Sequence, residues 1–170
     1  VLHVEHAGAV HRYVSGRLTY EAGAPAMGED TIFDAASLTK VVATTTAIMQ
    51  LVERGQLELD APVARYLPAF AQHGKGSITI RQLLTHRSGL RPDLDTKPAW
   101  SGYDTGVDLA AAEKLRSEPG AAFVYSDIGF IVLGELVRVV GGRPLEVHAA
   151  ENWIKRNTNQ LRKKVLEQGV

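Results

Sequence analysis

The sequence feature that most constrains the fold is an apolar stripe between residues 38 and 52. Apolar and β-branched residues recur there at spacings of three and four, which places them on one face of a helix: Leu38, Val41, Val42, Thr45, Ile48, Met49 and Val52. Asp34 is a suitable N-cap residue, and Gly55 is a suitable stop at the other end. The stripe therefore predicts the clearest helix in the chain.

The rest of the chain divides into a strand-forming start and a mainly helical remainder. Short alternating runs over residues 1–24 predict two or three antiparallel strands. Capping residues, glycines and prolines after the long helix predict further helices and loops: helices over 60–66, 80–86, 107–116, 128–140 and from near Pro144, and loops over 72–77 and 91–106. A loop as long as 91–106 shapes a site more often than it builds a core.

Composition narrows the classes of partner. The chain has 170 residues, 45% of them hydrophobic and 22% charged, which is typical of one globular domain. Lysine plus arginine and aspartate plus glutamate both total 19, so no net charge attracts nucleic acid or anionic lipid, and we expect neither partner. The absence of cysteine excludes disulfides and thiolate metal sites. No apolar stretch is long enough to cross a bilayer, so we expect no membrane span.

The start of the long helix carries a serine and a lysine three residues apart, Ser37 and Lys40. On a helix this spacing places both side chains on one face, one turn apart. Lysine can remove the proton of a serine nucleophile if burial or neighbouring positive charge lowers its pKa. The first helical turn also directs free backbone N–H groups at the serine oxygen. The alternative interpretation is that Ser37 caps the helix and Lys40 is a solvated side chain.

Several segments resemble, in order, the β-lactamase-related serine hydrolases: residues 33–40 (FDAASLTK), 55–63 (GQLELDAPV), 66–68 (YLP), 78–90 (ITIRQLLTHRSGL) and 119–127 (PGAAFVYSD). That family groups class C β-lactamases, D-alanyl-D-alanine carboxypeptidases and esterases of β-lactamase fold. The resemblance covers residues 1–154 and implies an α/β (α+β) fold of the β-lactamase/transpeptidase type, with an antiparallel sheet flanked by helices. It implies a hydrolase without a cofactor or metal. Its nucleophile, Ser37, would attack the carbonyl of a β-lactam, a D-Ala-D-Ala peptide or a small ester and form an acyl-enzyme.

The resemblance also assigns roles near residue 125. Tyr125 matches the tyrosine of the family's Tyr-x-Asn motif, which shares proton transfer with Lys40. Adjacent positive charge from Lys40 would let this tyrosine act near neutral pH. Asp127 stands where β-lactamases usually have asparagine, at a substrate-binding position. An aspartate can accept from Lys40 but cannot donate an amide N–H to a substrate carbonyl, which disfavours penicillin hydrolysis and leaves ester or peptide chemistry open.

The family's third motif, Lys-Thr-Gly or a histidine version of it, is not found in the sequence. His6-Ala7-Gly8 has the histidine form but precedes Ser37, so we interpret it as a hairpin turn. We therefore expect a truncated β-lactamase-like domain over 1–154, cut from a longer chain, followed by a basic helical tail over 155–170. No signal peptide precedes Val1, and the family's exported substrates favour a periplasmic or secreted location.

Other candidate sites have simpler explanations. His3, His6 and His11 are expected to be surface histidines, because no carboxylate or thiol pattern accompanies them. His86 and Ser88 suggest a catalytic pair, but a short helix and its glycine stop account for both. A second functional hypothesis is a catalytically silent binding or assembly module. An incomplete sheet would leave an unpaired edge, through which the chain would self-associate.

Overall fold

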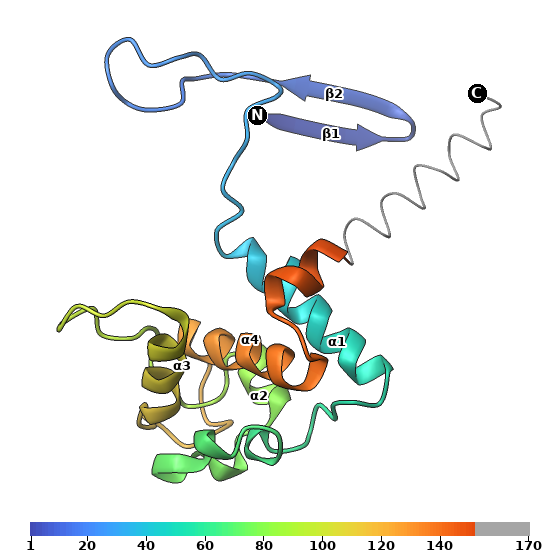
Figure 1. The fold of residues 1–170 in the computed structure, drawn as a ribbon. Helices are drawn as coiled ribbons and strands as arrows, with labels where there is room; N and C mark the ends of the chain where they lie inside the picture. The colour runs from blue at the N-terminus through green and yellow to red at the C-terminus, as the bar shows by residue number, and fades with distance from the viewer. Residues whose placement is uncertain (152–170) are drawn as a thin grey trace. The chain divides into compact units, whose positions relative to one another are not determined.

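A computed structural model describes residues 1–151 of the chain (Figure 1). The residues form two compact units that meet between residues 36 and 37. Each unit is described by itself. The predicted tail over 155–170 lies outside the described residues, and among those that are described no helix is long and apolar enough to cross a membrane.

The first unit contains a two-stranded antiparallel sheet. Strands β1 (Leu2–His6) and β2 (Ala9–Tyr13) pair with Leu2 opposite Tyr13. The turn between them consists of Ala7 and Gly8, with φ values of 50° and 81°, and two successive positive φ angles are typical of the tight turns that match strand twist. The predicted antiparallel strands and the hairpin turn at His6-Ala7-Gly8 are confirmed. Every residue of both strands is exposed.

The second unit begins with the predicted long helix, which continues from residue 38 to residue 53. Its middle is a π-helix, η1 (Lys40–Thr45), and its second half is α1 (Thr46–Glu53). Gly55 ends it in the left-handed conformation, as predicted. Asp34 is not its N-cap: the Asp34 carboxylate accepts from Ala36 N–H at 2.8 Å, which closes a turn before the helix begins.

The buried face of this helix differs from the predicted apolar stripe. Its buried residues are Thr44, Ala47, Ile48 and Leu51. Leu38, Val41, Val42 and Met49 belong to the predicted stripe, yet all are more than 40% exposed. The wider turns of η1 shift the register between the two halves, so a regular 3.6-residue period does not describe the buried face.

The remaining elements are short helices around one long one: η2 (Val63–Arg65), η3 (Pro68–Ser77), α2 (Ile80–Leu84), α3 (Tyr103–Ala112) and α4 (Asp127–Gly141), with residues 145–151 also helical. α2 and α4 lie where the sequence predicts helices. The loop expected over 72–77 is instead part of η3, with a kink at residues 72–74. α3 lies four residues earlier than predicted, because Glu113 is extended and turns its side chain to an ion pair with Arg91.

The core of the second unit lies around α4, which contacts α1, α2 and α3 (Figure 1). Its largest fully buried apolar side chains come from these helices and their connections: Ile48, Leu51, Leu57, Phe70, Ile78, Ile80, Leu83, Leu90, Ile128, Leu133 and Leu136. Thr79 caps α2 with a reciprocal capping box, in which Thr79 and Gln82 each bond the other's backbone. This packing fixes the start of α4 beside the start of the long helix, where the candidate site lies.

Candidate active site

The first pair of predicted site residues lies at the start of the long helix. Ser37 immediately precedes the first helical residue and is exposed. The Lys40 ammonium donates to Ser37 Oγ at 3.2 Å. The three-residue spacing therefore brings the two side chains together, as the sequence predicts.

The second pair comes from the start of α4. Lys40 Nζ lies 2.6 Å from Asp127 Oδ1 and 5.1 Å from the centre of the Tyr125 ring. The Tyr125 hydroxyl forms hydrogen bonds with Ser37 and Lys40. All four residues predicted from the sequence thus meet in one cluster, with the lysine amine at its centre.

The electrostatics of the cluster favour a charged Lys40 and lower the pKa of Tyr125. Hydrogen bonds to Ser37 and to the Lys40 ammonium lower the pKa of Tyr125. Burial opposes the charge on Lys40, but hydrogen bonds and attraction to Asp127 and Tyr125 outweigh it and raise the pKa of Lys40. Lys40 does not have the lowered pKa that a neutral lysine base requires. It therefore remains an ammonium at neutral pH and favours the phenolate beside it.

His86, which sequence reasoning attributed to a helix end, lies directly against Tyr125. The two rings have centroids 4.4 Å apart at 30°. His86 Nδ1 accepts from Ser126 N–H at 3.0 Å, and the His86 carbonyl accepts from Val124 N–H at 2.9 Å. One signal in the sequence could have indicated His86: it lies in segment 78–90, one of the segments that carry the family resemblance. The spacing between residues 86 and 125 does not by itself predict their contact.

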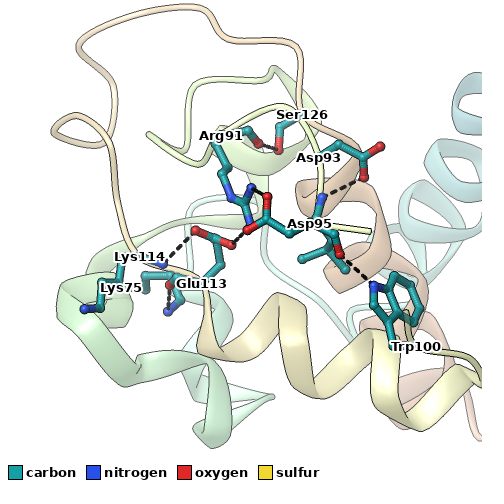
Figure 2. Close-up of polar contacts among 9 residues, drawn as sticks. Lys75, Arg91, Asp93, Asp95, Trp100, Glu113, Lys114 and Ser126 are labelled. Atoms are coloured by element: carbon teal, nitrogen blue, oxygen red, sulfur yellow. Dashed lines mark hydrogen bonds and ion pairs between the residues drawn. The ribbon is translucent and has the colours of Figure 1, made fainter. Parts of the chain in front are cut away.

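A second set of contacts attaches the start of α4 to the loop that begins at Arg91 (Figure 2). Ser126 Oγ donates to the Arg91 carbonyl at 2.7 Å, and Asp127 N–H donates to the Pro92 carbonyl at 2.7 Å. The Arg91 guanidinium bridges Asp95 and Glu113, each at 2.8 Å. Figure 2 shows the Arg91 side chain between Asp95 and Glu113, and the Arg91 carbonyl beside Ser126. These contacts attach the beginning of the predicted loop 91–106 to the start of α4, and its site-shaping role stays a prediction.

An apolar cavity of about 610 Å³ opens beside the cluster. Aromatic side chains of Trp100, Tyr103 and Phe130 line it. Phe130 connects the cavity with the cluster, because Lys40 Nζ lies 5.8 Å from the centre of the Phe130 ring. Within residues 1–151, no three histidine, aspartate or glutamate side chains gather in an arrangement that could hold a metal ion.

Comparison with known proteins extends these observations. The sequence profile of the Beta-lactamase family matches residues 3–160. The chain belongs to the β-lactamase family. Esterase EstB of Burkholderia gladioli is 39% identical over 160 residues, which cover 82% of this chain and 40% of the esterase. Penicillin-binding protein 4 of Amycolatopsis lactamdurans is 36% identical over 141 residues, which cover 80% of this chain and 36% of that protein.

The structural comparison gives the same family. A class C β-lactamase from Rhodobacter sphaeroides superposes with a TM-score of 0.68 and 30% sequence identity, over 88% of this chain and 41% of that protein. The predicted β-lactamase/transpeptidase-like fold is therefore confirmed, together with the family assignment. This β-lactamase-family chain spans about two fifths or less of the two curated relatives named above.

Proposed function

We propose that this β-lactamase-family chain is a serine hydrolase that forms an acyl-enzyme on Ser37. The observation that carries the proposal is the mutual contact of the Ser37 hydroxyl, the Lys40 ammonium and the Tyr125 phenol. A hydroxyl, a proton acceptor of lowered pKa and a fixed positive charge are the groups that nucleophilic attack on a carbonyl requires.

The proposed reaction uses Tyr125 as the proton carrier. The Tyr125 phenolate accepts the Ser37 proton while Oγ forms a bond with the substrate carbonyl carbon. The tetrahedral intermediate then loses its alcohol or amine, which receives the proton from the Tyr125 phenol. Water attacks the acyl carbon in the second half, with Tyr125 accepting its proton and returning a proton to Ser37 Oγ. Lys40 remains an ammonium throughout and stabilises the phenolate.

Among acyl substrates, a small ester fits the site better than a β-lactam. Asp127 accepts from Lys40 and has no amide N–H to offer a substrate amide carbonyl. The apolar cavity beside Phe130 would accommodate an uncharged acyl or alcohol group. The 39% identity with an esterase supports the same substrate class.

Covalent labelling tests the proposal. Mass spectrometry after exposure to a fluorophosphonate should find one adduct, on Ser37, and p-nitrophenyl acetate should acylate the same residue faster than a penicillin does. Ser37→Ala should abolish labelling, whereas Ser101→Ala, at another exposed serine, should leave it unchanged. A folded sample without an adduct on Ser37 would show that the proposal is wrong.

A second candidate function is a catalytically silent assembly module. The observation that favours it is the exposure of every residue in β1 and β2, together with the exposed Leu38, Val41 and Met49 on the long helix. A two-stranded sheet has an unpaired edge on each strand, which can pair with another copy of the chain. Its test is the oligomeric state of the unlabelled chain, since a clean monomer that acylates would exclude this candidate.

A further inference from the structure

We propose that His86 is a positioning residue that holds the Tyr125 phenol against Lys40 and Ser37, and that it does so only as the neutral imidazole. This inference rests on the proposed function, because it assigns the support of the proposed proton carrier. It concerns a residue that touches none of the reacting atoms and acts through Tyr125.

The Tyr125 ring packs among other aromatic rings. His86 stacks against Tyr125 on one side and lies 5.1 Å from the Phe130 ring and 5.7 Å from the Phe123 ring. Tyr125 itself is 44% exposed, so few other side chains restrict its rotation. The imidazole is therefore the aromatic surface that restricts where the phenol points.

The backbone on either side of Tyr125 is also held by His86. The residue before it donates from Val124 N–H to the His86 carbonyl, and the residue after it donates from Ser126 N–H to His86 Nδ1. One residue thus holds the N–H groups of both neighbours of the tyrosine. Its own backbone has φ of 56°, the left-handed conformation that non-glycine residues rarely adopt. With this backbone conformation, His86 presents both its ring and its carbonyl to residues 124–126.

The hydrogen bond with Ser126 fixes the protonation state of His86. Nδ1 can accept from Ser126 N–H only while it carries a lone pair, so the proton of the neutral ring resides on Nε2. The charged groups around the ring are Lys40, Asp127 and Tyr125. Burial and the Lys40 ammonium lower the pKa of His86, and Asp127 opposes this only in part. His86 is consequently neutral at neutral pH. A second proton at acid pH would break the Ser126 hydrogen bond and place a cation beside Lys40.

The test compares two substitutions that remove different properties of His86. His86→Phe keeps an aromatic ring but loses the acceptor and the titration. His86→Asn keeps an acceptor and tolerates the left-handed backbone, but loses the ring. His73→Phe is the matched control, because His73 has a similar φ of 54° in an exposed turn outside the site.

The main measurement is the rate of fluorophosphonate labelling of Ser37 across pH. Both His86 variants should label about 10- to 100-fold more slowly than the unchanged chain at pH 8, since a displaced catalytic group costs rates of this order. On the acid side, protonation of His86 should add one extra drop of about 10- to 100-fold in the unchanged chain, on top of the decline of about tenfold per pH unit that comes from Tyr125. The variants should lack this extra drop, because Tyr125 alone then titrates.

A second measurement separates failure of this inference from failure of the proposed function. The pKa of Tyr125 can be measured by tyrosinate absorbance, as the difference between each protein and its Tyr125→Phe derivative. It should lie below 10 in the unchanged chain and rise toward 10 in His86→Phe, because the phenol moves away from Lys40. An unchanged Tyr125 pKa in both His86 variants would overturn the inference whether or not Ser37 is labelled. If the chain never labels but the Tyr125 pKa rises as expected, the positioning role stands and the hydrolase proposal fails.

Discussion

Lys40 is subject to opposing effects whose balance decides how the site can work. Removing its amine from water disfavours the charge, whereas Asp127 at 2.6 Å and the Tyr125 hydroxyl favour it. The favourable contacts outweigh the effect of burial, so the pKa of Lys40 rises above its ordinary 10.5. Asp127 thus reinforces the ammonium form of Lys40, and the proposed mechanism accordingly uses Tyr125 as the proton acceptor.

Replacing Asp127 tests this balance. In Asp127→Asn the largest contribution that raises the pKa of Lys40 is lost, so that pKa should fall. The rate of Ser37 labelling should then begin to decline at a lower pH on the alkaline side, where Lys40 loses its proton. The pH profile of labelling measures the shift, with Asp108→Asn, an exposed aspartate of α3, as the control. An alkaline limb that stays in place would show that Asp127 does not control the charge of Lys40.

The residues of the site differ in whether their contacts could be predicted from the sequence. Ser37 and Lys40 are close in sequence, so helical spacing alone predicts their contact. Tyr125 and Asp127 required the family resemblance, because a separation of nearly ninety residues carries no spacing signal. His86 was missed, since its contact with Tyr125 depends on a left-handed backbone angle and on three aromatic rings that only the folded chain brings together.

At the scale of elements, local signals predicted most helix ends and failed where a distant contact decides the structure. Gly55 and Gly142 both end helices in the left-handed conformation, and Thr79 caps α2 through a motif visible in the sequence. The end of α3 was misplaced, because the ion pair of Glu113 with Arg91 overrides its helix propensity. The π-helix η1 has no sequence signature, and it changes which face of the long helix is buried.

A buried lysine connects two of these elements. Lys75, at the end of η3, has no exposed surface and donates to the backbone carbonyls of Gln72 and Glu113, the second just beyond the end of α3. Lys75→Met would leave these carbonyls without their donor, at a cost of about 1–3 kcal/mol in the free energy of unfolding. Urea denaturation measures the loss, and Lys114→Met, at an exposed neighbouring position, should change stability by less than about 0.5 kcal/mol.

The pH dependence of stability provides an independent check on Lys75. Burial lowers the pKa of Lys75 in the folded chain below the ordinary 10.5. Between the lowered value and 10.5, the unfolded chain binds more protons at this residue than the folded chain does, so this residue makes stability rise with pH in that window. Lys75→Met should remove that rise. An equal slope in both proteins would show that Lys75 is not perturbed by folding.

On the scale of the whole molecule, the proposed association between copies would use the edges of the β1–β2 hairpin. The two-residue turn at Ala7-Gly8 makes the flanking His6–Ala9 pair hydrogen-bonded, so in the next pair the N–H of Val10 points away from β1. That N–H is a donor available to a strand of another chain. The edge of β2 is therefore the position at which self-association can be tested without breaking the hairpin itself.

The matched substitutions at this edge are Val10→Pro and Val10→Thr. Proline removes the outward N–H at a position where the hairpin does not use it, whereas threonine keeps the N–H and the strand preference. If copies pair through this edge, light scattering after size-exclusion chromatography should give a multiple of 18.4 kDa for the unchanged chain and Val10→Thr, and 18.4 kDa for Val10→Pro. Concentration dependence of the mass would separate pairing from a fixed oligomer. A mass of 18.4 kDa for all three proteins at high concentration would exclude the edge of β2 as an interface. If Ser37 is labelled in that monomer, the serine hydrolase is the proposed function that remains.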